Sequence, residues 1–263
     1  MTMIIGIVSF GRNKGKTTLI EQITKRMTSQ RLTVATIKHA HSSFDTPQKD
    51  TWRHLQAGAS FTVATTPREI VVIKPSDNPT LQEALDSIPT KPVLLLVEGY
   101  KHSTIPKVVC VDNSSDLHKA LNEVSNIIAI TGSITANTEL ITIMRSQHPK
   151  IEAYGFEELI TLLQQNILED ISNNLPGLNC GDCGYEGCRD LAEAIINSEA
   201  STEKCIALTG NTTVLTVDNR VIPMKKFPQA FIRGIILGLI TSLKNVQHHP
   251  QHIEIHIMSQ ENQ

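Results

Sequence analysis

The stretch IIGIVSFGRNKGKTTL, residues 4–19, decides the fold. An apolar run typical of a buried strand is followed by a short polar loop and then by the start of a helical pattern. Gly15, Lys16 and Thr17 fit the second half of the phosphate-binding pattern G-x-x-x-x-G-K-[ST], although Phe10 stands where the first glycine is expected. Because a strand precedes this segment and a helix follows it, the sequence predicts a P-loop.

A phosphate group at this loop would be held by backbone N–H groups of residues 13–17 at the positive end of a helix. The Lys16 ammonium would meet the same phosphates, and the Thr17 hydroxyl would bind Mg²⁺. The alternative is a chance Gly-Lys-Thr at a helix cap. The predicted nucleotide-binding residues are Asn13, Lys14, Gly15, Lys16, Thr17 and Thr18.

Glu98 ends the apolar run PVLLLVEG at residues 92–99. A carboxylate at the carboxyl end of a central parallel strand lies where such sheets bind ligands. Glu98 is therefore the predicted partner of Thr17 at Mg²⁺ and the predicted catalytic residue, orienting a metal-bound water or accepting a proton. The alternative is a solvated acid at a strand end. Since no water-positioning glutamine is evident, any enzymatic activity should be at most that of a slow GTPase.

Strand and helix patterns alternate over the first 150 residues, and several strands are continuous apolar runs. This alternation predicts an α/β fold of the P-loop NTPase type, with a mostly parallel sheet and helices on both faces. The predicted strands are Met3–Ser9, Leu32–Ile37, Ser60–Thr65, Ile70–Lys74, Pro92–Glu98, Lys107–Asp112 and Asn126–Thr131. The predicted helices are Lys16–Ser29, Lys49–Ala57, Thr80–Ser87, Ser115–Val124, Asn137–Ser146 and Glu157–Asp170.

The segment TIKHAHSSFDTPQKDTWRHLQAGA, residues 36–59, resembles the signature loop of the molybdopterin-guanine dinucleotide biosynthesis protein B family. Those proteins have a Lys-His pair, then Phe-Asp, then a Lys-Asp-Ser/Thr-x-Arg-His segment that ends in Ala-Gly-Ala. VEGYK at 97–101 and Pro106-Lys107 are also similar to that family, and the resemblance covers roughly residues 1–165. The matching residues in the loop are Lys38, His39, His41, Phe44, Asp45, Lys49, Asp50, Thr51, Arg53, His54, Ala57, Gly58 and Ala59.

This resemblance implies a homodimer that binds GTP with Mg²⁺, hydrolyses GTP slowly and assists the molybdenum cofactor guanylyltransferase. On the residues alone, the basic side chains of this loop are equally consistent with contact to an anionic ligand and with an ordinary solvated loop. The choice between GTP and ATP stays open on the residues alone. The candidate substrate or switch residues of the loop are Lys38, His39, Asp45, Lys49, Asp50, Arg53 and His54.

A cluster of thiols lies in NCGDCGYEGC, residues 179–188, where Cys180, Cys183 and Cys188 are followed by Cys205. Zinc more often takes two C-x₂-C pairs, and only one is present here. Three close cysteines on a glycine-rich loop with a distant fourth suit an iron–sulfur cubane better than zinc or a redox dithiol. The segment resembles the [4Fe–4S] domain of electron-transfer subunits and corrinoid proteins. Cys110, inside a buried-strand pattern, is expected to be a core thiol.

The 263 residues include 40% apolar and 19% charged residues, with a net charge of −2. This charge balance does not indicate the basic surface that nucleic-acid-binding proteins present. The apolar segments are too short for a signal peptide or a membrane span, which predicts a cytoplasmic protein with reduced thiols. Composition shifts predict three domains: residues 1–170 for nucleotide binding, 171–208 for the iron–sulfur module, and 209–263 for a small α+β segment.

The iron–sulfur module is expected to carry a helix over residues 189–200, followed by a turn that returns Cys205 to the cluster. The α+β segment is expected to contain two short strands around Asn219, a long amphipathic helix over residues 227–246 and a last strand over residues 252–258.

Taken together, these patterns and resemblances predict a GTP-binding accessory protein of molybdenum cofactor biosynthesis with a [4Fe–4S] module. Its expected partner is the guanylyltransferase or another molybdoenzyme maturation protein. The alternative is a nucleotide-gated maturation or electron-transfer protein for a different metalloenzyme. In that case the cluster does the chemistry and the P-loop acts as a switch.

Overall fold

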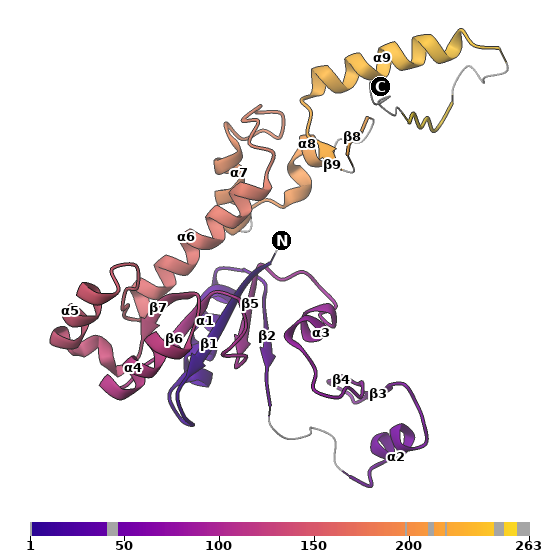
Figure 1. The fold of residues 1–263 in the computed structure, drawn as a ribbon. Helices are drawn as coiled ribbons and strands as arrows, with labels where there is room; N and C mark the ends of the chain where they lie inside the picture. The colour runs from indigo at the N-terminus through magenta and orange to yellow at the C-terminus, as the bar shows by residue number, and fades with distance from the viewer. Residues whose placement is uncertain are drawn as a thin grey trace, which may run out of the picture. The chain divides into compact units, whose positions relative to one another are not determined.

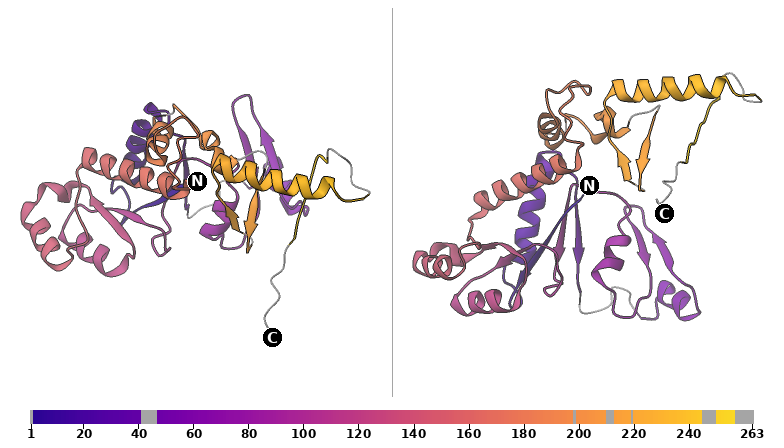
Figure 2. Two further views of the ribbon diagram at one scale, coloured as in Figure 1. Left: turned by 90° about the horizontal axis from the view of Figure 1, so that it is seen from above. Right: turned by 45° about the horizontal axis from the view of Figure 1, so that its top comes forward.

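The computed structural model describes residues 2–40, 47–197, 199–209, 213–218, 220–244 and 250–256. The chain divides into two compact units, Met1–Asp170 and Ile171–Gln263 (Figure 1). Figure 2 shows the same elements from two further directions. Within the described ranges, no helix is both long and apolar enough to cross a membrane.

The first unit is built on a five-stranded sheet with strand order β2-β5-β1-β6-β7, in which every neighbouring pair is parallel. The predicted α/β fold with an open parallel sheet is thereby confirmed. β1, which leads into the predicted P-loop, lies at the centre between β5 and β6. The strands are β1 (Met3–Ser9), β2 (Val34–Lys38), β5 (Leu94–Glu98), β6 (Lys107–Cys110) and β7 (Ile127–Thr131).

Helices cover both faces of this sheet. Val8 on β1 belongs to an apolar cluster with Leu117 and Met144, which come from the helices after β6 and β7. Its neighbour Ile7 points to the opposite face, because side chains alternate along a strand, and it is also fully buried. The helix after β1 contacts β1, β2 and β5. The helices of this unit are α1 (Lys16–Ser29), α2 (Asp50–Gln56), α3 (Leu81–Asp86), α4 (Ser114–Glu123), η1 (Ser133–Ala136), α5 (Thr138–Gln147) and α6 (Phe156–Asn174).

Two of the predicted strands do not join the parallel sheet. β3 (Thr62–Thr65) and β4 (Ile70–Ile73) pair with each other as an antiparallel two-stranded sheet. Only residues 66–69 connect them, and a parallel crossover needs a much longer connection. The short connection between the two strands therefore dictates a hairpin, although the sequence of each strand alone resembles that of the parallel-sheet strands.

The second unit contains the end of α6, three further short helices and a hairpin–helix segment. The predicted pair of short strands is present, as antiparallel β8 and β9, whereas Asn219 lies outside the described residues. The expected last strand is absent from described residues 250–256, where the alternating pattern finds no pairing partner in the described chain. The elements are α7 (Cys188–Ile196), η2 (Thr202–Lys204), α8 (Ile206–Thr209), β8 (Leu215–Val217), β9 (Arg220–Ile222) and α9 (Lys226–Thr241).

A buried lysine holds the loop that leads into β6. Lys107 is fully buried, and its ammonium donates hydrogen bonds to the carbonyl oxygens of Ser103, Ile105 and Ser125. Burial lowers the pKa of Lys107, but three carbonyl acceptors match the three donors of an ammonium group. A Cβ at Gly6 would lie 3.1 Å from Cγ of Lys107, so the glycine in β1 leaves room for the lysine stem.

Replacing this lysine should therefore destabilise the first unit. Lys107→Met keeps the apolar stem but leaves three carbonyl groups without their donor, which should lower the free energy of unfolding by about 3–5 kcal/mol. The urea midpoint measured by far-UV circular dichroism reports the change. The exposed Lys119→Met should stay within about 0.5 kcal/mol of the parent, and equal midpoints for the two variants would contradict a structural role for Lys107.

Candidate functional site

The loop between β1 and α1 has the geometry of a phosphate cradle. Gly11, Asn13 and Gly15 have positive φ angles of 104°, 56° and 75°. Such angles bend a short loop sharply, and glycine and asparagine adopt them most readily. α1 begins at Lys16 after the cap residue Gly15, and no side chain caps its first N–H groups. These N–H groups are therefore available to an anion at the positive end of the helix.

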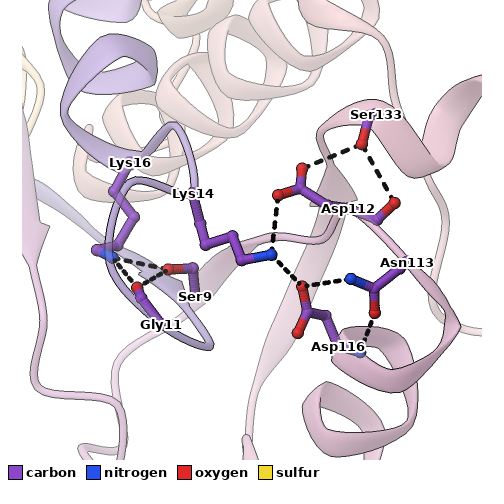
Figure 3. A network of polar contacts seen from close by, with 8 residues as sticks. All are labelled: Ser9, Gly11, Lys14, Lys16, Asp112, Asn113, Asp116 and Ser133. Atoms are coloured by element: carbon purple, nitrogen blue, oxygen red, sulfur yellow. Dashed lines mark hydrogen bonds and ion pairs between the residues drawn. The ribbon is translucent and has the colours of Figure 1, made fainter.

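The Lys16 ammonium lies across the loop (Figure 3). It donates hydrogen bonds to Oγ of Ser9 at 2.7 Å and to the carbonyl oxygen of Gly11 at 3.1 Å. Both acceptors are neutral, so a phosphate oxygen would be a stronger partner for this cation. Ser9, the last residue of β1, was not singled out from the sequence, because a serine at a strand end carries no distinctive signal.

Glu98 lies directly beside the start of α1. β5 pairs with β1 in parallel, so the carboxyl ends of the two strands meet at the same edge of the sheet. Oγ1 of Thr17 lies 3.2 Å and 3.3 Å from the two carboxylate oxygens of Glu98. A hydroxyl and a carboxylate at this spacing are oxygen ligands of the type that Mg²⁺ prefers. The structure thus brings together the two residues predicted to hold magnesium.

Lys38 completes this group from the neighbouring strand β2. Its ammonium lies 3.6 Å from the Glu98 carboxylate. The next residue, His39, donates its backbone N–H to the carbonyl oxygen of Glu98, and its ring stacks on Tyr100 with the ring centroids 4.5 Å apart. The start of the family signature segment therefore packs around Glu98.

The remaining signature residues lie elsewhere in the described chain or outside it. Lys49 precedes α2, and Asp50, Arg53 and His54 lie on α2, which packs beside β3. Arg53 approaches Asp50 at 4.0 Å, and both side chains are exposed. Asp45 lies outside the described residues.

Lys14 pairs with two carboxylates that the sequence analysis missed. Its ammonium lies 3.1 Å from Asp116 and 3.3 Å from Asp112 (Figure 3). Hydrogen bonding to Asp116 and then to Asp112 raises the pKa of Lys14. Asp112 follows β6 and also accepts a hydrogen bond from the hydroxyl of Ser133, after β7. This network joins the phosphate loop to the loops after β6 and β7.

Phe10 and Thr18 complete the loop region. Phe10 takes the place of the motif's first glycine, and the ammonium of Lys101 lies 4.3 Å from the centre of its ring. Lys101 is itself paired with Glu123 at 3.0 Å. Thr18 is exposed in the first turn of α1. The aromatic ring is thus fixed beside the VEGYK segment, whereas the Thr18 side chain faces solvent.

In the second unit, one pocket is lined by Cys180, Cys183, Cys188 and Cys205. Burial raises the pKa of Cys205, and the nearby thiols of Cys188 and Cys183 add to the rise. The other lining residues are glycine or apolar: Pro176, Leu178, Gly181, Gly187, Leu191, Ile206 and Ala207.

The backbone turns sharply at two of the three glycines that the sequence singles out beside this pocket. Gly181 and Gly184 have positive φ angles, and the side chain of Asn179 accepts a hydrogen bond from the N–H of Cys188, where α7 begins. The predicted turn before Cys205 is formed by η2. None of the described residues forms a group of three or more His, Cys, Asp or Glu side chains arranged to hold a single metal ion.

The fifth cysteine, Cys110, belongs to the first unit. It ends β6, and burial raises the pKa of its thiol to about 11. It is a core thiol, as expected.

Comparison with known proteins identifies the first unit. A family model described as "Molybdopterin guanine dinucleotide synthesis protein B" matches residues 4–133. A "Probable molybdopterin-guanine dinucleotide biosynthesis adapter protein" of Bacillus subtilis is 36% identical over 134 residues, covering 48% of this chain and 74% of that protein. The corresponding adapter protein of Haemophilus influenzae is 28% identical over 131 residues, covering 48% and 71%. A solved structure of Bacillus subtilis MobB aligns with a TM-score of 0.45 and 26% identity, covering 62% of this chain and 95% of that one.

The cysteine segment matches separately. A family model described as "Putative Fe-S cluster" covers residues 175–207 and so includes all four cysteines. One component of the ion-translocating oxidoreductase complex of Cereibacter sphaeroides is 54% identical over 39 residues, which cover 15% of this chain and 21% of that protein. The chain therefore belongs to the molybdopterin guanine dinucleotide synthesis protein B family, and it carries beyond the family domain a module of the iron–sulfur type.

Proposed function

We propose that this protein is a GTP-binding adapter of molybdopterin guanine dinucleotide biosynthesis that carries a [4Fe–4S] cluster. The observation that carries the proposal is the edge of the parallel sheet, where Lys16, Thr17 and Glu98 lie together beside an uncapped helix terminus. Such an edge suits a nucleoside triphosphate with its bound Mg²⁺. The relatives named as molybdopterin-guanine dinucleotide biosynthesis adapter proteins support a role in that biosynthesis.

In this proposal each residue has a defined part. The N–H groups of residues 13–17 and the Lys16 ammonium hold the phosphates, while Thr17 and Glu98 would hold Mg²⁺, which supplies charge neutralisation at the phosphates when bound. Glu98 also orients the attacking water. Lys38, whose ammonium lies 3.6 Å from Glu98, holds that carboxylate in place.

The four cysteine thiolates would hold the cluster, which supplies one-electron chemistry or a structural core when bound. Four thiols around a single pocket with apolar and glycine lining fit a four-thiolate cluster better than a disulfide pair. We assign residues 1–170 to nucleotide binding, 171–208 to the cluster and 209–263 to a third domain. We also propose a cytoplasmic homodimer that binds the guanylyltransferase.

The cluster module favours a second candidate function, that of a nucleotide-gated maturation or electron-transfer protein for another metalloenzyme. The match of residues in this module to a component of an oxidoreductase complex is the observation behind it. The two candidates differ in a measurable way. The adapter should bind the guanylyltransferase in a pull-down with purified proteins, whereas the alternative should show a cluster reduction potential that changes when GTP or ATP is added.

Lys16→Ala should weaken nucleotide binding about ten- to a hundredfold, because a charge-assisted contact to phosphate is lost. Calorimetric titration of anaerobically purified protein with GTP and with ATP measures the change and the base preference together. Lys25→Ala, an exposed lysine on the same helix, serves as the control and should bind like the parent. Equal affinities for the parent and Lys16→Ala would refute the phosphate-cradle assignment.

Glu98→Gln should reduce GTP hydrolysis about a hundredfold while the protein stays folded, because the amide neither orients water nor supports Mg²⁺ as the carboxylate does. Steady-state phosphate release measures the rate, which in the parent should be below about one per second. Glu21→Gln, an exposed acid on α1, should hydrolyse GTP at the parental rate. Unchanged GTP turnover in the Glu98→Gln variant would show that Glu98 is not the catalytic residue.

Anaerobic protein should be brown, with broad absorption near about 400 nm and about four irons per chain. Cys205→Ser should lose or destabilise the cluster because it removes one of the four thiolates that line the pocket. Cys110→Ser is the matched control and should retain the iron, since Cys110 lies in β6. Iron analysis and visible spectra test both variants, and a colourless protein with one zinc per chain would overturn the cluster assignment.

A further inference from the structure

The second unit presents a broad apolar surface on α9. At about 100° per residue, four of its large side chains fall within an arc of about 120°, and Leu243, just past the end of the helix, extends this arc to about 160°. Phe227 is 77% exposed and Leu239 is 63% exposed. Large apolar side chains exposed side by side mark a surface that another molecule covers. We name these four residues the apolar arc of α9: Phe227, Phe231, Ile235 and Leu239.

The charged side chains of α9 lie on the other side of the helix. Lys226 and Arg233 are seven residues apart, so they point in nearly the same direction, about 170° from the middle of the apolar arc. Both line the same pocket. Among the described residues, neither the Lys226 ammonium nor the Arg233 guanidinium has an ion-pair partner. The helix therefore has an uncharged apolar side and a cationic side whose charge is not neutralised.

The sequence around α9 is basic throughout. Residues 219–253 contain five of the 24 Lys and Arg residues of the chain and none of its 26 Asp and Glu residues. Apolar side chains together with unopposed positive charge complement a surface that is apolar inside and negatively charged outside. The five basic residues are Arg220, Lys225, Lys226, Arg233 and Lys244.

We propose that α9 docks on the surface of a membrane that contains anionic phospholipids. A helix of this kind lies parallel to the membrane, with its apolar side about 5–10 Å deep at the boundary between headgroups and acyl chains. Its cationic side then lies at the level of the lipid phosphates, which long Lys and Arg side chains reach. α9 has 16 residues. It is therefore about 24 Å long and rests on a hydrocarbon core about 30 Å thick rather than crossing it.

The width of the apolar arc favours a lipid surface over a partner helix. A partner helix contacts a narrow row of side chains, whereas a membrane surface covers a wide apolar face at once. Ser242 brings a hydroxyl into the arc, but this hydroxyl donates a hydrogen bond to the carbonyl oxygen of Leu239. Contact with lipid would therefore leave this polar side chain paired.

Membrane docking is separate from the proposed function. The family model matches residues 4–133, and α9 lies far beyond them. The backbone N–H of Lys226 donates to Asp182 in the cysteine loop, and this contact is kept when only side chains of α9 are changed. Loss of docking should leave GTP affinity and iron content unchanged, so failure of this proposal and failure of the proposed function are distinguishable.

The test is co-sedimentation of the full chain, purified anaerobically, with vesicles that mix phosphatidylglycerol and phosphatidylcholine. Binding should rise with the phosphatidylglycerol fraction and fall in about 0.5 M salt. Phe231→Ser/Leu239→Ser should weaken binding about a hundredfold, because two apolar anchors are lost without a change of charge. Ile143→Ser removes an exposed apolar side chain on α5 and should bind like the parent. Far-UV circular dichroism and iron content verify that each variant is folded.

Lys226→Gln/Arg233→Gln tests the charges separately. It should weaken binding to phosphatidylglycerol-rich vesicles about twentyfold and leave binding to pure phosphatidylcholine unchanged. Lys25→Gln, an exposed lysine on α1, should change either affinity less than about twofold. Millimolar inorganic phosphate at constant ionic strength should not release the parent from vesicles. Release would show that the two cations hold a free phosphate and would overturn the lipid assignment.

Hydrogen–deuterium exchange of peptides from residues 226–241 locates the contact. Vesicles should slow exchange there in the parent but not in Phe231→Ser/Leu239→Ser. The proposal is wrong if the parent does not bind vesicles, if its binding is independent of phosphatidylglycerol, or if the parent and both double variants bind equally. It is also wrong if exchange in α9 slows with protein concentration and vesicles have no effect, because a second copy then covers the apolar arc.

Discussion

The parallel pairing of β1 with β5 on one side and β6 on the other is the constraint on which the candidate nucleotide site depends. Parallel strands end at the same edge, so the loop after β1, Glu98 at the end of β5 and Asp112 after β6 meet there. The residues come from positions more than 80 apart in sequence, as the contact between Thr17 and Glu98 shows. The buried residues of β1, β5 and β6 hold the register, because sliding one of these strands by one residue would turn its side chains to the other face.

Much of this edge, and of the cysteine pocket in the second unit, could be predicted from local patterns. The strand–loop–helix context of Lys16 and Thr17, the apolar run that ends in Glu98 and the spacing of the four cysteines each place a residue without knowledge of its neighbours. The pairs of the polar network could not be predicted in the same way. Asp116 reads as part of an ordinary helix start, since its backbone N–H donates to the side-chain oxygen of Asn113, which caps α4. Nothing in a single sequence shows that the same carboxylate also holds Lys14.

Pairing between strands was the other limit of sequence patterns. β3 and β4 look like sheet strands one at a time, but their four-residue connection makes them a hairpin outside the parallel sheet. The alternating residues of 252–256 have the period of a strand, yet a strand exists only where another backbone accepts its hydrogen bonds. The period of the apolar residues shows which side chains share a face, whereas the rest of the fold decides which strands pair.

The bridge from Lys14 to Asp112 and Ser133 has a consequence for communication within the first unit. Lys14 lies in the phosphate loop, and Ser133 begins η1 in the segment after β7, so a ligand that displaces the lysine must also disturb the carboxylate and the hydroxyl bound to it. Energetic coupling of this kind is reciprocal: a protein that grips the segment after β7 would change the affinity for phosphate by the same factor by which phosphate changes the affinity for that protein. Under the proposed function, the bridge from Lys14 would let the segment after β7 respond to whether the phosphate loop is occupied.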